Sequence, residues 1–171
     1  MKGFIQVYTG DGKGKTTAAL GLAVRAAGAG LRVFIAQFMK GREYSELKAL
    51  ERFRDLITVK QYGLRSFIED KPSDDDIRCA AEGLREVREA LTSGAYDLVI
   101  LDEANMAVHF GLFTVDQLLD VMEAKPGHVE LVITGRCSDP RIIEKADLVT
   151  EMVEVKHYYS RGVKARKGIE L

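Results

Sequence analysis

The residue types best suited to chemistry form one glycine-rich run near the start of the chain, Thr9-Gly10-Asp11-Gly12-Lys13-Gly14-Lys15-Thr16-Thr17. Glycines let backbone N–H groups turn toward a phosphate without Cβ clashes, and a lysine followed by a hydroxyl can reach phosphate oxygens and Mg²⁺. The run follows the strand-like segment 4–8 and precedes the helix-like segment 15–27, whose N-terminus would face the same anion. It therefore predicts a phosphate-binding loop, with one departure: Thr9 stands where the usual pattern has its first glycine, and Gly10 comes one place later.

A second group of candidate ligands follows the apolar run 96–101, where Asp102 and Glu103 stand side by side. Nucleotide-binding folds use such acids, at the end of a buried strand, to hold Mg²⁺ directly or through water. Two acids can also simply solvate a strand end, but the loop upstream favours the metal. We therefore predict a Mg²⁺ site at Thr16, Asp102 and Glu103. The two carboxylates do not by themselves specify a reaction.

Several classes of nucleotide-binding protein are excluded by what the chain lacks. A GTPase needs Asn-Lys-x-Asp to read guanine, but the only asparagine, Asn105, is followed by Met106. There is no Leu-Ser-Gly-Gly-Gln run of a transporter ATPase, and no obvious internal arginine-rich lid of a nucleotide kinase. These absences leave open a small P-loop kinase or ATPase, which would act by phosphoryl transfer or hydrolysis. We keep this class as an alternative function.

Positive charge gathers near the end of the chain. Residues 156–167 contain five lysines and arginines and no acid, although the whole chain has a net charge of −1. Such a cluster can steer a polyanion or can be an ordinary solvated segment. Arg161 is our candidate from this cluster for substrate binding, and the neighbouring Tyr158-Tyr159, Gly162 and Gly168 indicate ordered backbone.

Length and composition limit the class of protein. The chain has 171 residues, 46% of them hydrophobic and 30% charged, which is typical of one soluble globular domain spanning residues 1–171. Nothing in the charge balance points to nucleic acid or to a membrane. Cys79 and Cys137 lie far apart without metal-site spacing, and no signal peptide or membrane-spanning run is visible, so we expect reduced thiols and a cytoplasmic location.

Strand-like and helix-like segments alternate along the chain, with short connections. Strands are expected at 4–8, 32–38, 57–62, 96–101, 129–134 and 146–155, and helices at 15–27, at 43–54, from a cap at Ser73, from a capping box at Thr114 to Ala124, and after Asp139-Pro140. This alternation predicts an α/β three-layer sandwich on a mainly parallel sheet, which with the phosphate loop makes it P-loop NTPase-like (RecA-like).

Taken together, the motifs resemble the ATP:corrinoid adenosyltransferases of the CobA/BtuR (CobO) type. The resemblance covers nearly the whole chain and rests on residues 9–19, 37–41, 101–105, 134–136, 156–157 and 162–170, in that order. It implies adenosyl transfer rather than phosphoryl transfer: a corrinoid reduced to Co(I) attacks the 5′-carbon of ATP and expels tripolyphosphate. The cobalt is then the nucleophile, so no Ser, Cys or His base is needed.

The resemblance also implies roles for particular residues. Lys15, Thr16 and Glu103 would act in catalysis by stabilising the departing triphosphate, with residues 10–17 and Arg161 binding the substrates. Phe67 corresponds to the aromatic residues that the family places near the lower face of the corrinoid, whereas the tryptophan of some members is absent here.

Partners follow from the same resemblance. The family is dimeric, so a homodimer is expected, and Co(I) requires an electron donor such as a flavodoxin or reduced flavin.

A third hypothesis, beside the adenosyltransferase and the P-loop kinase or ATPase, is a non-catalytic module that binds ATP and corrinoid without turnover.

Overall fold

The computed structural model describes residues 2–42, 44–64 and 71–170, and Phe67 therefore lies outside the described residues. Its centre is a six-stranded sheet in the order β3-β2-β4-β5-β1-β6, in which every pair of neighbours is parallel. The strands are β1 (Ile5–Thr9), β2 (Val33–Phe38), β3 (Ile57–Tyr62), β4 (Leu98–Asp102), β5 (Glu130–Thr134) and β6 (Leu148–Glu151). The predicted parallel sheet is confirmed, and β6 is shorter than the expected 146–155.

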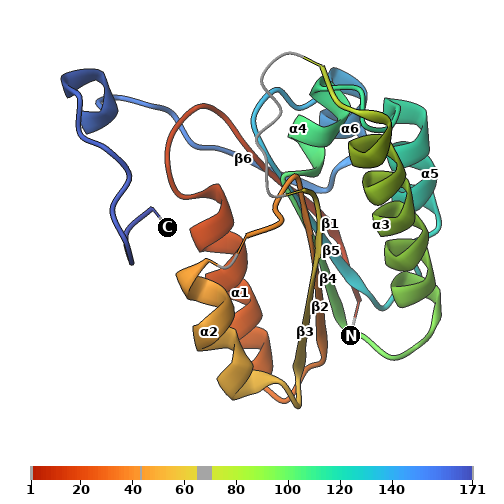
Figure 1. The fold of residues 1–171 in the computed structure, drawn as a ribbon. Coiled ribbons are helices and arrows are strands. Elements are labelled where there is room, and N and C mark those ends of the chain that lie inside the picture. Colours follow the sequence, from red (N-terminus) through yellow and green to blue (C-terminus); the bar gives the residue numbers. More distant parts are fainter. Residues whose placement is uncertain (1, 43, 65–70, 171) are drawn as a thin grey trace.

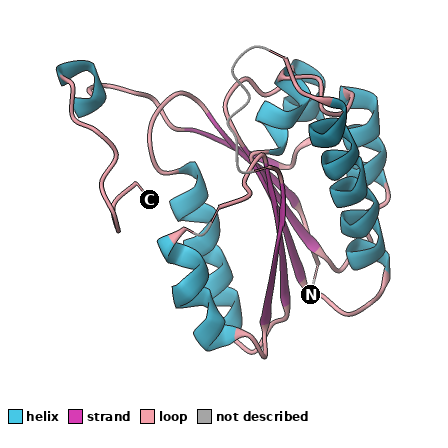
Figure 2. Cartoon of the chain, viewed as in Figure 1, coloured by secondary structure: helices cyan, strands magenta, loops and turns pink. Residues whose placement is uncertain are grey.

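Helices cover both faces of this sheet (Figures 1 and 2). They are α1 (Lys15–Gly28), α2 (Ser45–Leu50), α3 (Asp74–Thr92), α4 (Ala104–His109), α5 (Val115–Glu123) and α6 (Pro140–Lys145), with 3₁₀ turns η1 (Glu51–Phe53) and η2 (Tyr158–Arg161). Helices α1 and α2 lie on one face, and α3, α4, α5 and α6 on the other. The buried side chains form two clusters accordingly, one on each side of the sheet. The three-layer α/β sandwich is thus confirmed.

Local capping chemistry sets where the predicted helices begin. At α3 the Ser73 hydroxyl accepts a hydrogen bond from the Asp76 amide, while the Asp76 carboxylate accepts one from the Ser73 amide. Thr114 forms the same capping box at α5, and Asp139 caps α6. Helix α4 was not predicted, because its N-cap residue, Glu103, has a left-handed φ of 61° and no side-chain cap. None of the described helices is long and apolar enough to cross a membrane.

Two helical glycines differ in their surroundings and give the first prediction. A Cβ built on Gly83 in α3 would lie 2.6 Å from Cγ of Tyr62 and 2.8 Å from Cε1 of Phe38, whereas one built on Gly21 in α1 meets nothing within 4 Å. Gly83→Ala should therefore lower the free energy of unfolding by about 1–3 kcal/mol through overpacking. Gly21→Ala should raise it by about 0.5–1 kcal/mol through helix propensity. Urea unfolding measures both, and changes of the same sign would contradict this packing.

Candidate active site

The glycine-rich run forms a loop between β1 and α1, as predicted. Gly10 and Gly14 have φ values of 90° and 124°, which side-chain-bearing residues rarely adopt. The left-handed turn thus begins at Gly10, while Thr9 is still the last residue of β1, which explains the displaced glycine of the motif. The loop is also tied to the segment after β6, because the Gly12 amide donates to the Met152 carbonyl at 2.6 Å.

Lys15 is the first residue of α1, and its side chain folds back beneath the loop. Its ammonium group donates to the carbonyls of Gly10 (2.5 Å) and Gly12 (2.7 Å). Burial lowers the pKa of Lys15, and the nearby Arg136 lowers it further, against an opposing effect of Glu103 and Asp11. A partly desolvated cation beside the N-terminus of a helix is suited to binding phosphate oxygens.

Asp102 ends β4 with its side chain buried at 1% exposure, and donors from several elements surround its carboxylate. Thr16 and Thr134 donate to Oδ1, each at 2.8 Å. Lys40 donates to Oδ2 at 2.8 Å, and Gln37 does so at 3.3 Å. A buried charge is tolerated only when it is paired and hydrogen-bonded. Here the partners come from α1, from β2 and the residues that follow it, and from β5.

Glu103, the next residue, is held in a strained conformation beside the loop. Its φ is 61°, and its amide donates to the Thr134 hydroxyl at 3.0 Å. Burial and the neighbouring Asp102 carboxylate raise the pKa of Glu103, against the opposing charges of Lys40, Lys15 and Arg136. Strained backbone of this kind gathers at functional sites.

Strain recurs at the same edge of the sheet. Among the described residues, the non-glycine residues with positive φ are Met39 (58°), Glu103 (61°) and Cys137 (52°). They lie just beyond the carboxyl ends of β2, β4 and β5, which are neighbours in the sheet. Ligands of open parallel sheets bind at this edge, and the strained residues mark its centre.

A cavity of about 820 Å³ opens at this edge. It is lined by the phosphate loop and α1 as far as Val24, by α2, and by Lys40, Glu103, Arg136 and the C-terminal segment. A second hollow of about 310 Å³ adjoins it and shares Lys40, Tyr44, Glu103 and Arg136. Volumes of this size suit small-molecule substrates, and the four shared residues face both hollows.

Metal binding at this site would need ligands beyond the protein. The described residues contain no group of three or more His, Cys, Asp or Glu side chains that could hold a metal. The Thr16 hydroxyl and the Asp102 and Glu103 carboxylates are nevertheless oxygen ligands of the kind that Mg²⁺ prefers. Since Mg²⁺ in nucleotide sites takes further ligands from phosphates and water, this oxygen set fits a nucleotide-bound ion.

The structure brings most of the predicted site residues together. Residues 12–17 and Glu103 line the larger cavity, and Asp102 lies directly behind Thr16. Asp11 and Gly10 belong to the loop but do not line the cavity, and the exposed Arg161 on η2 does not line it either.

Sequence reasoning missed part of the lining. The larger cavity is also bordered by Lys40, Tyr44, Arg136 and residues 168–170, which were not named as site residues. The sequence carried a positional signal for two of them. Lys40 follows the end of β2 and Arg136 follows the end of β5, just as Glu103 follows the end of β4.

A glycine-rich loop between a strand and a helix, with a buried acid ending a nearby strand of a parallel sheet, is the architecture of a P-loop NTPase-like α/β domain. Within that class, the chain belongs to the ATP:corrinoid adenosyltransferase family BtuR/CobO/CobP, whose family profile matches residues 1–171. This confirms the resemblance seen in the motifs.

Individual relatives agree with the family match. The chain is 36% identical to a corrinoid adenosyltransferase of Pseudomonas aeruginosa over 170 residues, which cover 99% of this chain and 84% of the relative. It is also 36% identical to the corrinoid adenosyltransferase CobA of Salmonella typhimurium, over 99% of this chain and 86% of the relative. A corrinoid adenosyltransferase of Sinorhizobium is 34% identical, with 99% and 80% covered.

The ion pair of Lys40 with Asp102 gives the second prediction. Lys40 is largely buried; burial alone would lower its pKa, but Asp102, Glu46 and Glu103 outweigh that effect and raise it. Lys40→Met should lower the free energy of unfolding by about 3 kcal/mol, because it leaves a buried carboxylate short of its cation. Adding Asp102→Asn should restore part of the loss.

The matched control is Lys60, whose ion pair with Glu86 lies on the surface. Lys60→Met should change the free energy of unfolding by less than about 1 kcal/mol, because exposed pairs contribute little. Urea unfolding measures all of these variants. Equal losses for Lys40→Met and Lys60→Met would show that burial does not set the strength of the Asp102 pair.

Proposed function

We propose that the protein transfers the 5′-deoxyadenosyl group of ATP to the Co(I) centre of a reduced corrinoid, of the cobalamin or cobinamide type, and releases tripolyphosphate. The observation that carries this proposal is that the phosphate loop and Glu103 line one cavity, with Asp102 directly behind Thr16, in a chain that belongs to the ATP:corrinoid adenosyltransferase family. In this reaction cobalt supplies both electrons of the new Co–C bond and becomes Co(III). The C5′–O bond breaks, and its electron pair leaves with the triphosphate.

The protein's own contribution is electrostatic. Negative charge grows on the triphosphate as the C5′–O bond breaks, and preorganised cations and N–H groups stabilise that charge. Lys15, the loop amides and the N-terminus of α1 lie on one side of the larger cavity, and Arg136 lies on its lining. Thr16, Asp102 and Glu103 would hold Mg²⁺, which when bound supplies further positive charge to the phosphates.

No protein base is needed, since the nucleophile carries no proton to remove. Of the three histidines, only His157 lines the larger cavity, and its Nδ1 accepts a hydrogen bond from the Tyr159 amide at 3.0 Å. Phosphoryl transfer or hydrolysis would instead require a group that orients an attacking hydroxyl or water. The family match likewise does not favour that alternative.

Part of the corrinoid would enter the second hollow, whose volume of about 310 Å³ is smaller than a whole corrinoid. Phe38, Met39 and Met106 give it apolar walls, and it adjoins the nucleotide cavity at Glu103 and Arg136. A corrinoid placed there would bring its cobalt toward the nucleotide side. Phe67, the residue expected near the lower face, lies outside the described residues and keeps that role as part of this proposal.

The remaining partners are proposals of the same kind. Co(I) requires a strong reductant, for which we expect a flavodoxin or reduced flavin, and Arg161 and the other exposed basic residues of 156–167 form a surface that an acidic donor would match. We expect a homodimer acting in the cytoplasm. The edge strand β6 is exposed along its length, and a second copy could cover such an edge.

The products of the reaction test the proposed function. When the protein is mixed anaerobically with MgATP and chemically reduced cob(I)alamin, the absorbance spectrum should change to that of an adenosylcorrinoid. Chromatography of the nucleotide products should give tripolyphosphate in equal amount. Formation of ADP and phosphate instead would overturn the proposal in favour of a kinase or ATPase, and binding without turnover would favour a carrier.

Charged residues of the cavity give a further prediction. Lys15→Ala and Thr16→Ala should each lower kcat/KM by about 10²–10³-fold, because each removes a group that stabilises the departing triphosphate. Arg136→Ala should lower it by about tenfold or more for the same reason. Arg141→Ala is the control, since Arg141 pairs with Asp116 on the surface and should keep normal turnover.

Circular dichroism would show that these variants retain the fold. Near-normal turnover of Lys15→Ala or Thr16→Ala would contradict the assignment of the nucleotide site.

A further inference from the structure

The C-terminal segment, residues 157–170, forms one wall of the larger cavity. It leaves the sheet after β6, passes through η2 and returns to end beside α1 (Figure 1). His157, Gly168, Ile169 and Glu170 line the cavity together with the phosphate loop. Most of the segment is otherwise exposed, so its position must depend on particular contacts.

Lys13 of the phosphate loop makes those contacts. Its ammonium group donates to the Tyr158 hydroxyl at 3.0 Å, to the Ile169 carbonyl at 3.1 Å and to Oε1 of Glu170 at 2.7 Å. An ammonium group has three N–H donors, and all three are used here on the C-terminal segment. Lys15, by contrast, donates to the Gly10 and Gly12 carbonyls of the loop itself. Two lysines two residues apart therefore face different partners.

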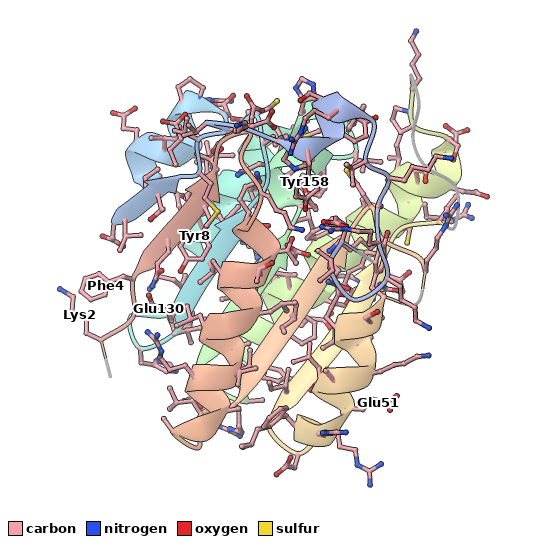
Figure 3. All side chains as sticks on the ribbon, turned by 90° about the vertical axis from the view of Figure 1, so that its left-hand side faces the viewer. Lys2, Phe4, Tyr8, Glu51, Glu130 and Tyr158 are labelled. Atoms are coloured by element: carbon pink, nitrogen blue, oxygen red, sulfur yellow. The ribbon has the colours of Figure 1, made fainter. Side chains whose placement is uncertain are left out.

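Glu170 is the centre of the same network. Arg166 donates to it from its backbone amide at 2.8 Å and from Nη2 at 3.0 Å, and the Tyr158 hydroxyl donates to Oε1. The Arg166 guanidinium lies 4.9 Å from the centre of the Tyr158 ring, and Figure 3 marks Tyr158 on this segment. Arg166, Lys13 and Tyr158 together hold the pKa of the Glu170 carboxyl well below its usual range.

The network explains how a carboxylate can stand beside a phosphate site. A free carboxylate on the cavity wall would repel the triphosphate, but Glu170 is neutralised by two cations. Single exposed ion pairs contribute little, yet a network that shares a carboxylate, a hydroxyl and a carbonyl orders several groups at once.

We propose that Lys13 anchors the C-terminal segment as a wall of the nucleotide cavity, through Glu170 and Tyr158, rather than binding the phosphates itself. Glu170 does not contact ATP in this proposal; it acts through Lys13 and is therefore a positioning residue. The inference rests on the proposed function, because it takes the cavity to be the ATP site. It gives the two lysines of the loop separate roles: Lys15 for the substrate and Lys13 for the cavity wall.

A double-mutant cycle on Lys13 and Glu170 tests the link to ATP. Calorimetric titration with MgATP should show that Lys13→Met and Glu170→Gln each raise the Kd by about threefold to tenfold. The double variant should bind no worse than either single variant, because both break the same anchor. Tighter binding by Glu170→Gln would mean that Glu170 competes with the triphosphate for Lys13. That result, additive losses or an unchanged Kd for Glu170→Gln would each overturn the proposal.

Limited trypsin digestion without any ligand tests the anchor separately. Cleavage after Arg161, Lys164 and Lys167 should be faster, by a similar factor, in Lys13→Met and Glu170→Gln than in the unaltered protein. The control is Glu154→Gln, since the exposed Glu154 lies just before the segment and should leave the rate unchanged.

The two readouts separate the two proposals. Wild-type protein that binds no ATP but shows the expected digestion pattern would overturn the proposed function and leave the anchor standing. Normal ATP binding with digestion rates unchanged in both variants would overturn the anchor alone.

Discussion

The buried carboxylate of Asp102 is the constraint on which the arrangement of the site depends. The Asp102 side chain is only 1% exposed, so its charge must be paired, and its partners come from α1, from β2, from Lys40 shortly after β2, and from β5. Any shift of these elements would leave part of the charge unpaired. The hydroxyl of Thr16 and the ammonium of Lys40 are thereby held at fixed positions around β4. The phosphate loop is thus oriented by an electrostatic requirement inside the sheet as well as by its own glycines.

Much of the fold could be predicted because its signals are local. The cap at Ser73, the capping box at Thr114 and the apolar run before Asp102 depend on neighbouring residues alone. The sheet order depends on contacts between distant segments, so the sequence indicated a parallel sheet without its order. Helix α4 was missed because the left-handed Glu103 starts it without any capping side chain. That conformation is maintained by tertiary contacts, including the bond from the Glu103 amide to Thr134.

The candidate site divides in the same way. Lys15, Thr16, Asp102 and Glu103 could be predicted as candidates because they belong to contiguous motifs with a known chemical purpose. Arg136 was not named as a site residue, although residues 134–136 form one of the motifs, because its place on the cavity depends on how β5 packs beside β4. The case of Lys13 is different: its position in the loop suggested a phosphate contact, and only the returning C-terminal segment shows another set of partners.

The arrangement also bears on how a phosphate loop can serve adenosyl transfer. In phosphoryl transfer the protein must hold both the phosphoryl group and its attacking oxygen, whereas in the proposed reaction the whole triphosphate is the leaving group. A loop, a helix N-terminus and cationic side chains that stabilise phosphate charge are suited to both reactions, so the same groups can serve phosphoryl transfer and adenosyl transfer. What must change is the side from which the nucleophile arrives. In the proposed reaction the second hollow, which shares Lys40, Glu103 and Arg136 with the larger cavity, would be that side, and a nucleophile that carries no proton would need no positioned base.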